Sequence, residues 1–433
     1  MTRGDSVHTL VLGAGPAGLA CAARLAARGL APIVVEAGSE PGGLMRGLRR
    51  GGFRVDLGRK ELYTRLPEVH ELLRELLGDE LRSYPHRAGI LYGGRILEMS
   101  NGPRGRRRGM PWRWLLLGGM ELLWARLRPF SAPPTNYEEF WYRRRGVRFA
   151  RILSQGFEEK FRGRRWVDVP PPEGEKRPEF ADDAPQGWWH PRYGTDQIVT
   201  ALLQRVVAGG GEVRCGEAIR AIERDGERIL AVATVGAGGT TRYRPRFVAS
   251  SLPVEHLGQL LGVAPDREPL ASDTAPRRGV VMVYLFCDAP PRFPHAWLQV
   301  TCPNLRMGRV VNYGAFGGDM APPGKGCLCV EFFYVAPSPF AELGEAGVAD
   351  LALRECVSAG LVDGRTCTDR LVLDVPGGDP ATTAADWQSP GRRRLVTAIE
   401  SVDNLFDMKR PGIDKALQAG LATAAAIATR SRP

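Results

Sequence analysis

The sequence contains only eight cysteines and six histidines in 433 residues. This cysteine content is far below the roughly 8–10% of a disulfide scaffold. Cys327 and Cys329 form a C-x-C pair and the other cysteines stand singly, so neither residue type shows the spacing of metal ligands. We therefore expect no metal site, and a chain kept in the reducing cytoplasm.

Long apolar runs are also missing. No uninterrupted run reaches the roughly 18–20 residues that span a membrane, and the N-terminus lacks the basic segment and small-residue cleavage site of a signal peptide. The composition, with 43% hydrophobic and 25% charged residues, excludes the disordered and fibrous classes. The length allows two or three domains at roughly 100–200 residues each.

Positive charge is concentrated in one segment. Residues 101–165 hold 16 basic and five acidic residues, a difference of +11 that equals the formal charge of the whole chain. Such a segment suits an anionic partner, which could be a phosphate-bearing substrate, an acidic protein, a membrane surface or nucleic acid. No nucleic-acid recognition motif accompanies it, so we expect no nucleic-acid binding.

A glycine motif follows the first predicted strand. The strand at 8–12 ends at Gly13-Ala14-Gly15-Pro16-Ala17-Gly18, a helix is predicted over 19–28, and a second strand over 31–36 ends at Glu36. This order is typical of dinucleotide binding, with the pyrophosphate at the helix N-terminus and the acid on the ribose hydroxyls, where it disfavours a 2′-phosphate. The alternative is a purely structural turn.

The residues after Glu36 favour a flavin. The run EAGSEPGG at 36–43 leads to Arg46 and then to GGFRVDLG at 51–58. This pattern resembles the FAD-dependent superfamily that contains protoporphyrinogen oxidase, phytoene desaturases, flavin amine oxidases and, more distantly, UDP-galactopyranose mutase. In that superfamily, a double glycine and a basic residue lie near the pyrophosphate, and a G-F-x-x-D-x-G strand leads to the flavin ring.

The resemblance continues along the chain. Residues 188–198 resemble the family's YPxGG segment before a helix, here expected at 197–208, and Ile219 lies on a strand like the one whose backbone meets adenine. Residues 247–253 resemble the strand that returns to the Rossmann sheet, and 136–163 resemble a region of protoporphyrinogen-oxidase-like proteins. We therefore place the chain in that branch.

The C-terminal residues 404–407 and 411–420 are similar to the last flavin motif, whose helix N-terminus points at the flavin pyrimidine edge. An ordinary capped surface helix is the alternative. Together these resemblances imply that FAD is contacted by Gly13, Gly15, Pro16, Ala17, Gly18, Glu36, Ala37, Gly43, Leu44, Arg46, Gly58, Arg59, Ile219, Asp407, Gly412, Ile413 and Ala416.

Two positions depart from the family pattern. Arg59 and Lys60 stand where the family has glycine and a histidine or small residue, so a cation beside the flavin could tune the ring or bind an anionic substrate. Phe406 replaces a glycine of the C-terminal motif, and residues 408–410 lengthen it.

The fold class expected is α/β, with a Rossmann-like FAD-binding domain and an interleaved α+β substrate domain. The FAD domain would be built from 1–60, 190–265 and 390–433, and the substrate domain from 61–189 and 266–389. Strands are expected at 280–286, 309–313 and 327–334, where β-rich runs are separated by proline and glycine turns.

Residues 110–130 combine tryptophans and leucines with Arg113, Arg126 and Arg128. The segment predicts an amphipathic helix with three alternative roles. Its apolar face could cover the substrate cavity, it could lie in a membrane interface, or its arginines could capture an anionic substrate.

No Ser-His-Asp or metal set is present, so the chemistry must belong to the cofactor. Lys60, Arg309 and Tyr313 are the catalytic candidates, and Tyr63, Asn312 and Glu331 are further residues that could line the pocket. The isolated histidines His190 and His295 are expected to be structural.

The leading hypothesis is an FAD-dependent oxidase or desaturase that moves a hydride from a substrate C–H to flavin N5. The substrate would be a small molecule with a hydrophobic or anionic character. The alternatives are a redox-neutral flavin mutase or isomerase, and a non-catalytic binding protein on the same fold, as in the Rab GDP-dissociation inhibitors.

Overall fold

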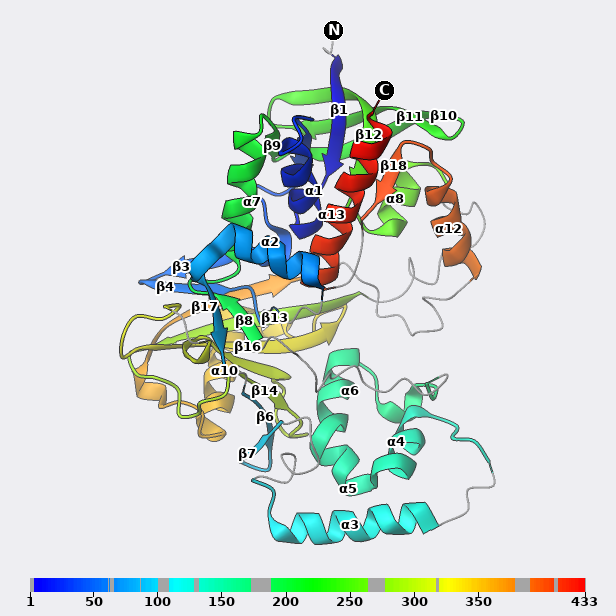
Figure 1. Ribbon diagram of the computed structural model, residues 1–433. Helices are drawn as coiled ribbons and strands as arrows, with labels where there is room; N and C mark the ends of the chain where they lie inside the picture. The colour runs from blue at the N-terminus through cyan, green and yellow to red at the C-terminus, as the bar shows by residue number, and fades with distance from the viewer. Residues whose placement is uncertain are drawn as a thin grey trace.

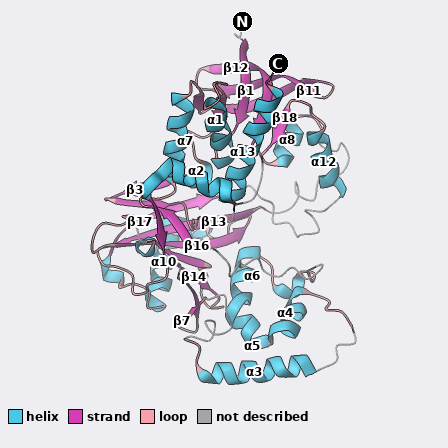
Figure 2. Ribbon diagram, viewed as in Figure 1, coloured by secondary structure: helices cyan, strands magenta, loops and turns pink. Residues whose placement is uncertain are grey.

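A computed structural model describes residues 4–60, 62, 66–85, 87–99, 109–127, 132–172, 188–263, 277–316, 319–377, 390–408 and 412–432. Within these residues the chain builds two large mixed sheets, with a group of helices beyond the second sheet (Figures 1 and 2). The fold is therefore α/β, as the sequence predicts.

The first sheet contains the predicted Rossmann strands. Its central strand β1 pairs in parallel with β12 and β2, and β12 also pairs in parallel with the short C-terminal strand. The order is β10 (Ala218–Asp225), β11 (Arg228–Gly236), β12 (Gly239–Ser250), β1 (Gly4–Leu12), β2 (Ile33–Glu36) and β9 (Glu212–Cys215), with β18 (Leu405–Asp407) beside β12.

Helices pack apolar residues onto the first sheet in two groups. The first group comprises α1 (Pro16–Ala26), α2 (Pro67–Leu77), α7 (Asp196–Ala208) and α13 (Ile413–Arg430), and the second comprises α8 (Val254–Leu260) and α12 (Pro390–Glu400). Helix α2 comes from the segment assigned above to the substrate domain, yet Val69, Leu72 and Leu73 join the same core as α1 and α7.

The second sheet follows the predicted β-rich runs. Its order is β17 (Cys367–Val375), β13 (Arg278–Cys287), β16 (Gly326–Val335), β15 (Arg309–Asn312), β14 (Trp297–Val300), β6 (Ala88–Tyr92) and β7 (Arg95–Glu98). Helix α10 (Gly344–Ser358) covers one face. Cys287 and Cys367, on paired strands, are joined by a disulfide that the spacing of cysteines did not predict.

The other face of the second sheet packs toward the first domain. Its side chains form one core with β4 (Phe53–Asp56), the partner of β3 (Gly47–Arg50). Nearby, β5 (Leu81–Tyr84) pairs with β8 (Trp188–Pro191). The residues after β4 therefore run along the contact between the two sheets.

The helical group contains α3 (Trp112–Leu127), α4 (Tyr137–Arg145), α5 (Val147–Ala150) and α6 (Gly156–Arg162). It lies beyond the second sheet, and α3 is its outermost element (Figure 1). No helix among the described residues has both the length and the apolar composition to cross a bilayer.

Candidate cofactor and active site

The glycine motif forms the turn between β1 and α1. Gly13 has φ of +96°, and a Cβ on Gly18 would lie 2.0 Å from the Gly13 carbonyl oxygen, so both positions require glycine. A Cβ on Gly15 would meet nothing within 4 Å. The backbone is therefore tightly packed at Gly13 and Gly18, whereas the space next to Gly15 is open.

Helix α1 starts at this open space with Pro16 at its first position, followed by Ala17, and no acidic side chain lies in its first turn. The first N–H groups of a helix have no intrahelical partner, and the helix dipole makes that end attractive to an anion. The arrangement suits a phosphate group in front of Gly15.

Glu36, at the end of β2, is fixed by two backbone N–H donors. Its Oε2 accepts from Ala14 N at 2.8 Å, and its Oε1 accepts from Gly38 N at 2.8 Å. Each carboxylate oxygen keeps a further lone pair for a ribose hydroxyl. The next residue, Ala37, is exposed.

The strand of Ile219 reaches the same place. Gly216 N donates to Gly38 O at 2.8 Å, and Glu217 N donates to Glu36 O at 2.9 Å. Ile219 follows two residues later, at the start of β10. The predicted adenine strand thus begins beside the predicted ribose acid.

The double glycine lies against the first motif. Gly42 N donates to Ala14 O at 2.8 Å, and a Cβ on Gly43 would lie 3.6 Å from the Gly15 Cα. Leu44 is 57% exposed, and Arg46 donates from Nε to Gly43 O at 3.0 Å. The structure therefore brings both glycine loops to one end of α1.

The C-terminal motif approaches from the other side of α1. Gly412, with φ of +88°, precedes α13, and Ala416 N donates to its carbonyl at 3.0 Å. Helix α13 begins at Ile413 and crosses α1 so closely that a Cβ on Gly420 would lie 2.3 Å from Ala17 O. Both helices start at the edge of the first domain that faces the second sheet (Figure 1).

Asp407 ends β18 and pairs in register with Ser250 of β12. Residues 409–411 of the lengthened motif lie outside the described residues.

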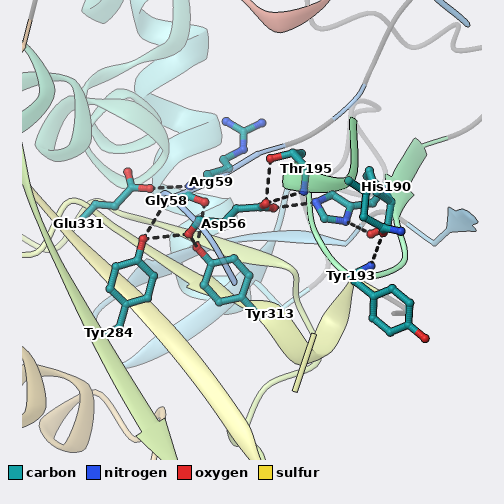
Figure 3. Close-up of polar contacts among 11 residues, drawn as sticks. Asp56, Gly58, Arg59, His190, Tyr193, Thr195, Tyr284, Tyr313 and Glu331 are labelled. Carbon is teal, nitrogen blue, oxygen red and sulfur yellow. Dashed lines mark hydrogen bonds and ion pairs between the residues drawn. The ribbon is translucent and has the colours of Figure 1, made fainter. Parts of the chain in front are cut away.

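Both carboxylate oxygens of Asp56, at the end of β4, make hydrogen bonds (Figure 3). Its Oδ2 lies 2.9 Å from His190 Nε2, while its Oδ1 accepts from Thr195 N at 2.7 Å and Thr195 Oγ1 at 2.8 Å. Burial alone would raise the pKa of Asp56, but the hydrogen bonds from His190 and Thr195 outweigh it and hold that pKa below its usual value. Asp56 therefore ties β4 to the segment before α7.

Two tyrosines hold the backbone that follows Asp56. Gly58 N donates to the Tyr284 hydroxyl at 3.1 Å, and that hydroxyl lies 2.8 Å from Asp56 O (Figure 3). The Tyr313 hydroxyl lies 2.6 Å from Asp56 O and 2.9 Å from Gly58 O. Because its hydroxyl is committed to backbone oxygens and its side chain is buried, Tyr313 is placed to position this turn.

Glu331 of β16 connects the turn to the second sheet. It accepts from Arg59 N at 2.9 Å through Oε1 and from Arg309 Nη1 at 2.7 Å through Oε2. Gly58 has φ of +68°, and a Cβ there would lie 2.8 Å from Glu331 Oε1. Only glycine therefore allows the carboxylate to approach this turn.

Arginines and aromatic rings extend from Glu331. The Arg59 guanidinium lies 3.9 Å from the centroid of Trp297, and Arg309 lies 5.8 Å from the same ring. Arg309 also lies 5.3 Å from Phe333 and 5.5 Å from Phe157 of α6. We name these five residues, Arg59, Arg309, Trp297, Phe333 and Phe157, the arginine–aromatic cluster.

Lys60 sits next to this cluster. Within the described part of the chain, its ammonium makes no hydrogen bond or ion pair. Burial lowers the pKa of Lys60, and the nearby charges of Asp56 and Glu331 only partly oppose that effect. The predicted candidate Tyr63 lies outside the described residues.

The remaining candidates have structural contacts. Asn312 donates from Nδ2 to Phe293 O at 3.0 Å, and His295 Nε2 lies 3.2 Å from Glu98 Oε1. Among the described residues, no group of three or more His, Cys, Asp and Glu is placed to hold a metal ion.

The sequence did not single out Tyr284, Trp297 or the bond between Asp56 and His190. The aspartate stands in the G-F-x-x-D-x-G pattern, but its partners lie 134 and 139 residues further along the chain. No local spacing reveals such pairs, because they form only when the two sheets come together.

Comparison with known proteins gives consistent matches. Residues 11–76 match the NAD(P)-binding Rossmann-like domain. The chain is 26% identical over 402 residues to the phytoene dehydrogenase of Streptomyces griseus, a match that covers 79% of this chain and 75% of the relative.

Solved structures extend the likeness over the whole chain. Reduced UDP-galactopyranose mutase superposes with a TM-score of 0.79 at 17% identity, covering 99% of this chain and 96% of that one. The protein therefore shares the overall fold of this structure. A putative protoporphyrinogen oxidase from Exiguobacterium sp. 255-15 matches with a TM-score of 0.70 at 16% identity, over 100% of both chains. The resemblance seen in the sequence is thus confirmed.

Proposed function

We propose that this protein is an FAD-dependent oxidoreductase, an oxidase or desaturase that removes a hydride from a substrate C–H. The observation that carries the proposal is the convergence of the two glycine loops, Glu36 and the N-terminus of α13 around one end of α1. These elements lie up to 400 residues apart in the sequence, and each would contact a different part of one extended dinucleotide.

The cofactor fits the residues present. Gly15 leaves the space that a pyrophosphate needs, and the uncapped start of α1 supplies donors and a favourable dipole. The Glu36 carboxylate suits ribose hydroxyls and would repel a 2′-phosphate. Gly43 and Arg46 would flank the pyrophosphate, Ile219 the adenine, and Asp407 and Gly412 the flavin end.

When bound, FAD supplies the hydride acceptor, flavin N5. The chain's own residues position and shield that end. The backbone of Gly58 and Arg59 is fixed by hydrogen bonds to Tyr284, Tyr313 and Glu331. Residues of the second domain therefore hold in place the turn that would border the flavin. The positive end of the α13 dipole would favour negative charge on the pyrimidine side.

The arginine–aromatic cluster would receive the substrate. Its rings offer apolar and stacking contacts, while Arg59 and Arg309 offer positive charge. Arg309 is already paired with Glu331, so it would orient the substrate rather than exchange protons. Lys60, whose pKa is lowered by burial and whose ammonium has no ion-pair partner among the described residues, is the better candidate for moving a proton.

The test is anaerobic mixing of the FAD-loaded protein with candidate substrates of three classes: polyene hydrocarbons, cyclic tetrapyrroles and primary amines. We expect one class to bleach the visible flavin band without added reductant, and oxygen to restore it. If every class leaves the flavin oxidised while FAD is bound, net oxidation of these substrates is not its reaction.

A redox-neutral reaction is the second candidate, favoured by the high TM-score to reduced UDP-galactopyranose mutase. The two candidates separate by one experiment. A mutase-like or isomerase-like protein would convert its substrate only after dithionite reduction of the flavin, and would show no net consumption of an oxidant.

A further inference from the structure

The contacts of helix α3 with the other described residues lie mainly on one of its sides. Trp114 packs edge-on to Tyr92 at 5.5 Å, and Phe149 lies so close to Gly118 that a Cβ there would be 2.6 Å from the ring. Glu121 accepts from Arg148 N at 2.7 Å. These contacts turn one side of α3 toward α4 and α5 and leave the opposite side facing away from both sheets (Figure 1).

The outward side of α3 is apolar. Six large side chains along it, at helical spacing, are between 52% and 70% exposed: Trp112, Leu116, Met120, Leu123, Trp124 and Leu127. Single exposed hydrophobic residues are common on the surfaces of soluble proteins, whereas a continuous row of this length is typical of a binding surface. Met120 and Trp124, at one edge of this row, also line a cleft that α3 forms with α4. The predicted role of this helix as a cover for the substrate cavity stays a prediction.

The charges of α3 have one sign on this side. Arg113 and Arg126 are exposed near the two ends of the helix. Its one acidic residue, Glu121, is directed inward and pairs with Arg148. The flanking sequence adds Arg104, Arg106, Arg107, Arg108 and Arg128, which lie outside the described residues.

We propose that the outward side of α3 docks onto an anionic lipid bilayer, with the helix lying in the plane of the interface. At 16 residues the helix is about 24 Å long, too short to cross a hydrocarbon core of roughly 30 Å. Tryptophans near both ends suit the headgroup level, the central leucines and methionine suit the acyl boundary, and the arginines suit anionic headgroups.

A second copy of the chain fits this surface less well. A two-fold pairing of α3 with itself would bring like charges together, because the one acidic residue of α3, Glu121, is paired with Arg148 and does not neutralise Arg113 and Arg126. A bilayer with anionic lipids meets both the apolar row and the arginines.

The test is sedimentation of the FAD-loaded protein with vesicles of phosphatidylcholine, alone or mixed with phosphatidylglycerol. We expect binding to the mixed vesicles, weaker binding to phosphatidylcholine, and loss of binding in high salt. Leu123→Glu places an acid in the apolar row and should weaken binding by at least about 10-fold. Leu230→Glu, at a 49% exposed leucine of β11, is the matched control and should bind as the unmodified protein does.

Two further variants test the contribution of positive charge to vesicle binding. Arg113→Gln and Arg126→Gln should each weaken binding to the mixed vesicles roughly 5-fold and leave binding to phosphatidylcholine nearly unchanged. Circular dichroism checks folding, and Leu116→Gln replaces Leu123→Glu if that variant is misfolded.

Three results would overturn the proposal. The first is failure of the protein to bind the mixed vesicles, and the second is equal binding by Leu123→Glu. The third is light scattering that shows a dimer which Leu123→Glu converts to a monomer, since the surface would then belong to a second copy.

Discussion

Gly15 and Gly18 belong to one motif but carry different constraints. A Cβ on Gly15 meets no protein atom within 4 Å, whereas a Cβ on Gly18 lies 2.0 Å from Gly13 O. We predict that Gly15→Ala leaves the melting temperature of the FAD-free protein nearly unchanged and weakens FAD binding by about 10-fold, or about 1.4 kcal/mol. Gly18→Ala should instead destabilise the FAD-free protein by about 1–3 kcal/mol. Equal FAD affinity for Gly15→Ala and the unmodified protein would place the pyrophosphate elsewhere.

Asp56 gives a prediction with a defined pH dependence. Its pKa is lower in the folded state, so its stabilising contribution is fully present above the unfolded value of about 3.8 and is lost as the pH falls through the folded value. Asp56→Asn should therefore cost about 3–5 kcal/mol at neutral pH. Urea unfolding should show this difference at pH 7 and a shrinking difference below about pH 4. A difference that does not change with pH would contradict the assigned cause.

At the residue scale, the sequence predicted the constraints that are local. Gly13 and Gly18 act within one turn of the chain, and Glu36 binds Ala14 N only 22 residues away within the same strand–helix–strand unit, so spacing alone points to these contacts. The neighbours of Tyr313 could not be predicted, because its hydroxyl meets Asp56 O and Gly58 O from 257 and 255 residues away. Its predicted catalytic role, like those of Lys60 and Arg309, stays a prediction.

Among elements, the crossing of α1 and α13 brings the two ends of the chain together at the proposed cofactor site. A Cβ on Gly420 would lie 2.3 Å from Ala17 O, so Gly420→Ala must push the helices apart. We predict a loss of about 1–3 kcal/mol of stability together with weaker FAD binding. Gly119→Ala, in the interior of α3 with no atom near its Cβ, is the matched control and should be stabilising by roughly 0.5–1 kcal/mol. Thermal unfolding and FAD titration measure both effects.

The elements themselves were largely visible in the sequence. The helix predicted over 19–28 is found at Pro16–Ala26, and the strand predicted over 327–334 is found at Gly326–Val335. The helix predicted over 110–130 is found at Trp112–Leu127, but the direction in which it turns its leucines was not predictable. That direction depends on Gly118 fitting against Phe149, a contact between distant elements.

At the scale of the whole molecule, the two sheets meet around charged groups that stability alone would not favour. The Lys60 ammonium loses hydration on folding and has no ion-pair partner among the described residues, so Lys60→Met should raise the free energy of unfolding by on the order of 1–3 kcal/mol. The same variant should lose substrate turnover if Lys60 moves a proton. Lys415→Met, at an exposed lysine of α13, is the control for the loss of one positive charge. A destabilised Lys60→Met with full turnover would show that the lysine is structural.

The domain boundaries and the cytoplasmic location remain predictions. They depend on how the chain folds in the cell, which neither the strand order nor the likeness to other structures addresses. The proposed function depends on one cofactor held between the two glycine loops and α13.

The most direct measurement is the absorption spectrum of the purified protein, followed by acid release and chromatographic identification of the chromophore. We predict a flavin spectrum and the release of FAD in a ratio near one per chain. A colourless protein that cannot be reconstituted with FAD would contradict it, and would leave a binding role on an inherited fold.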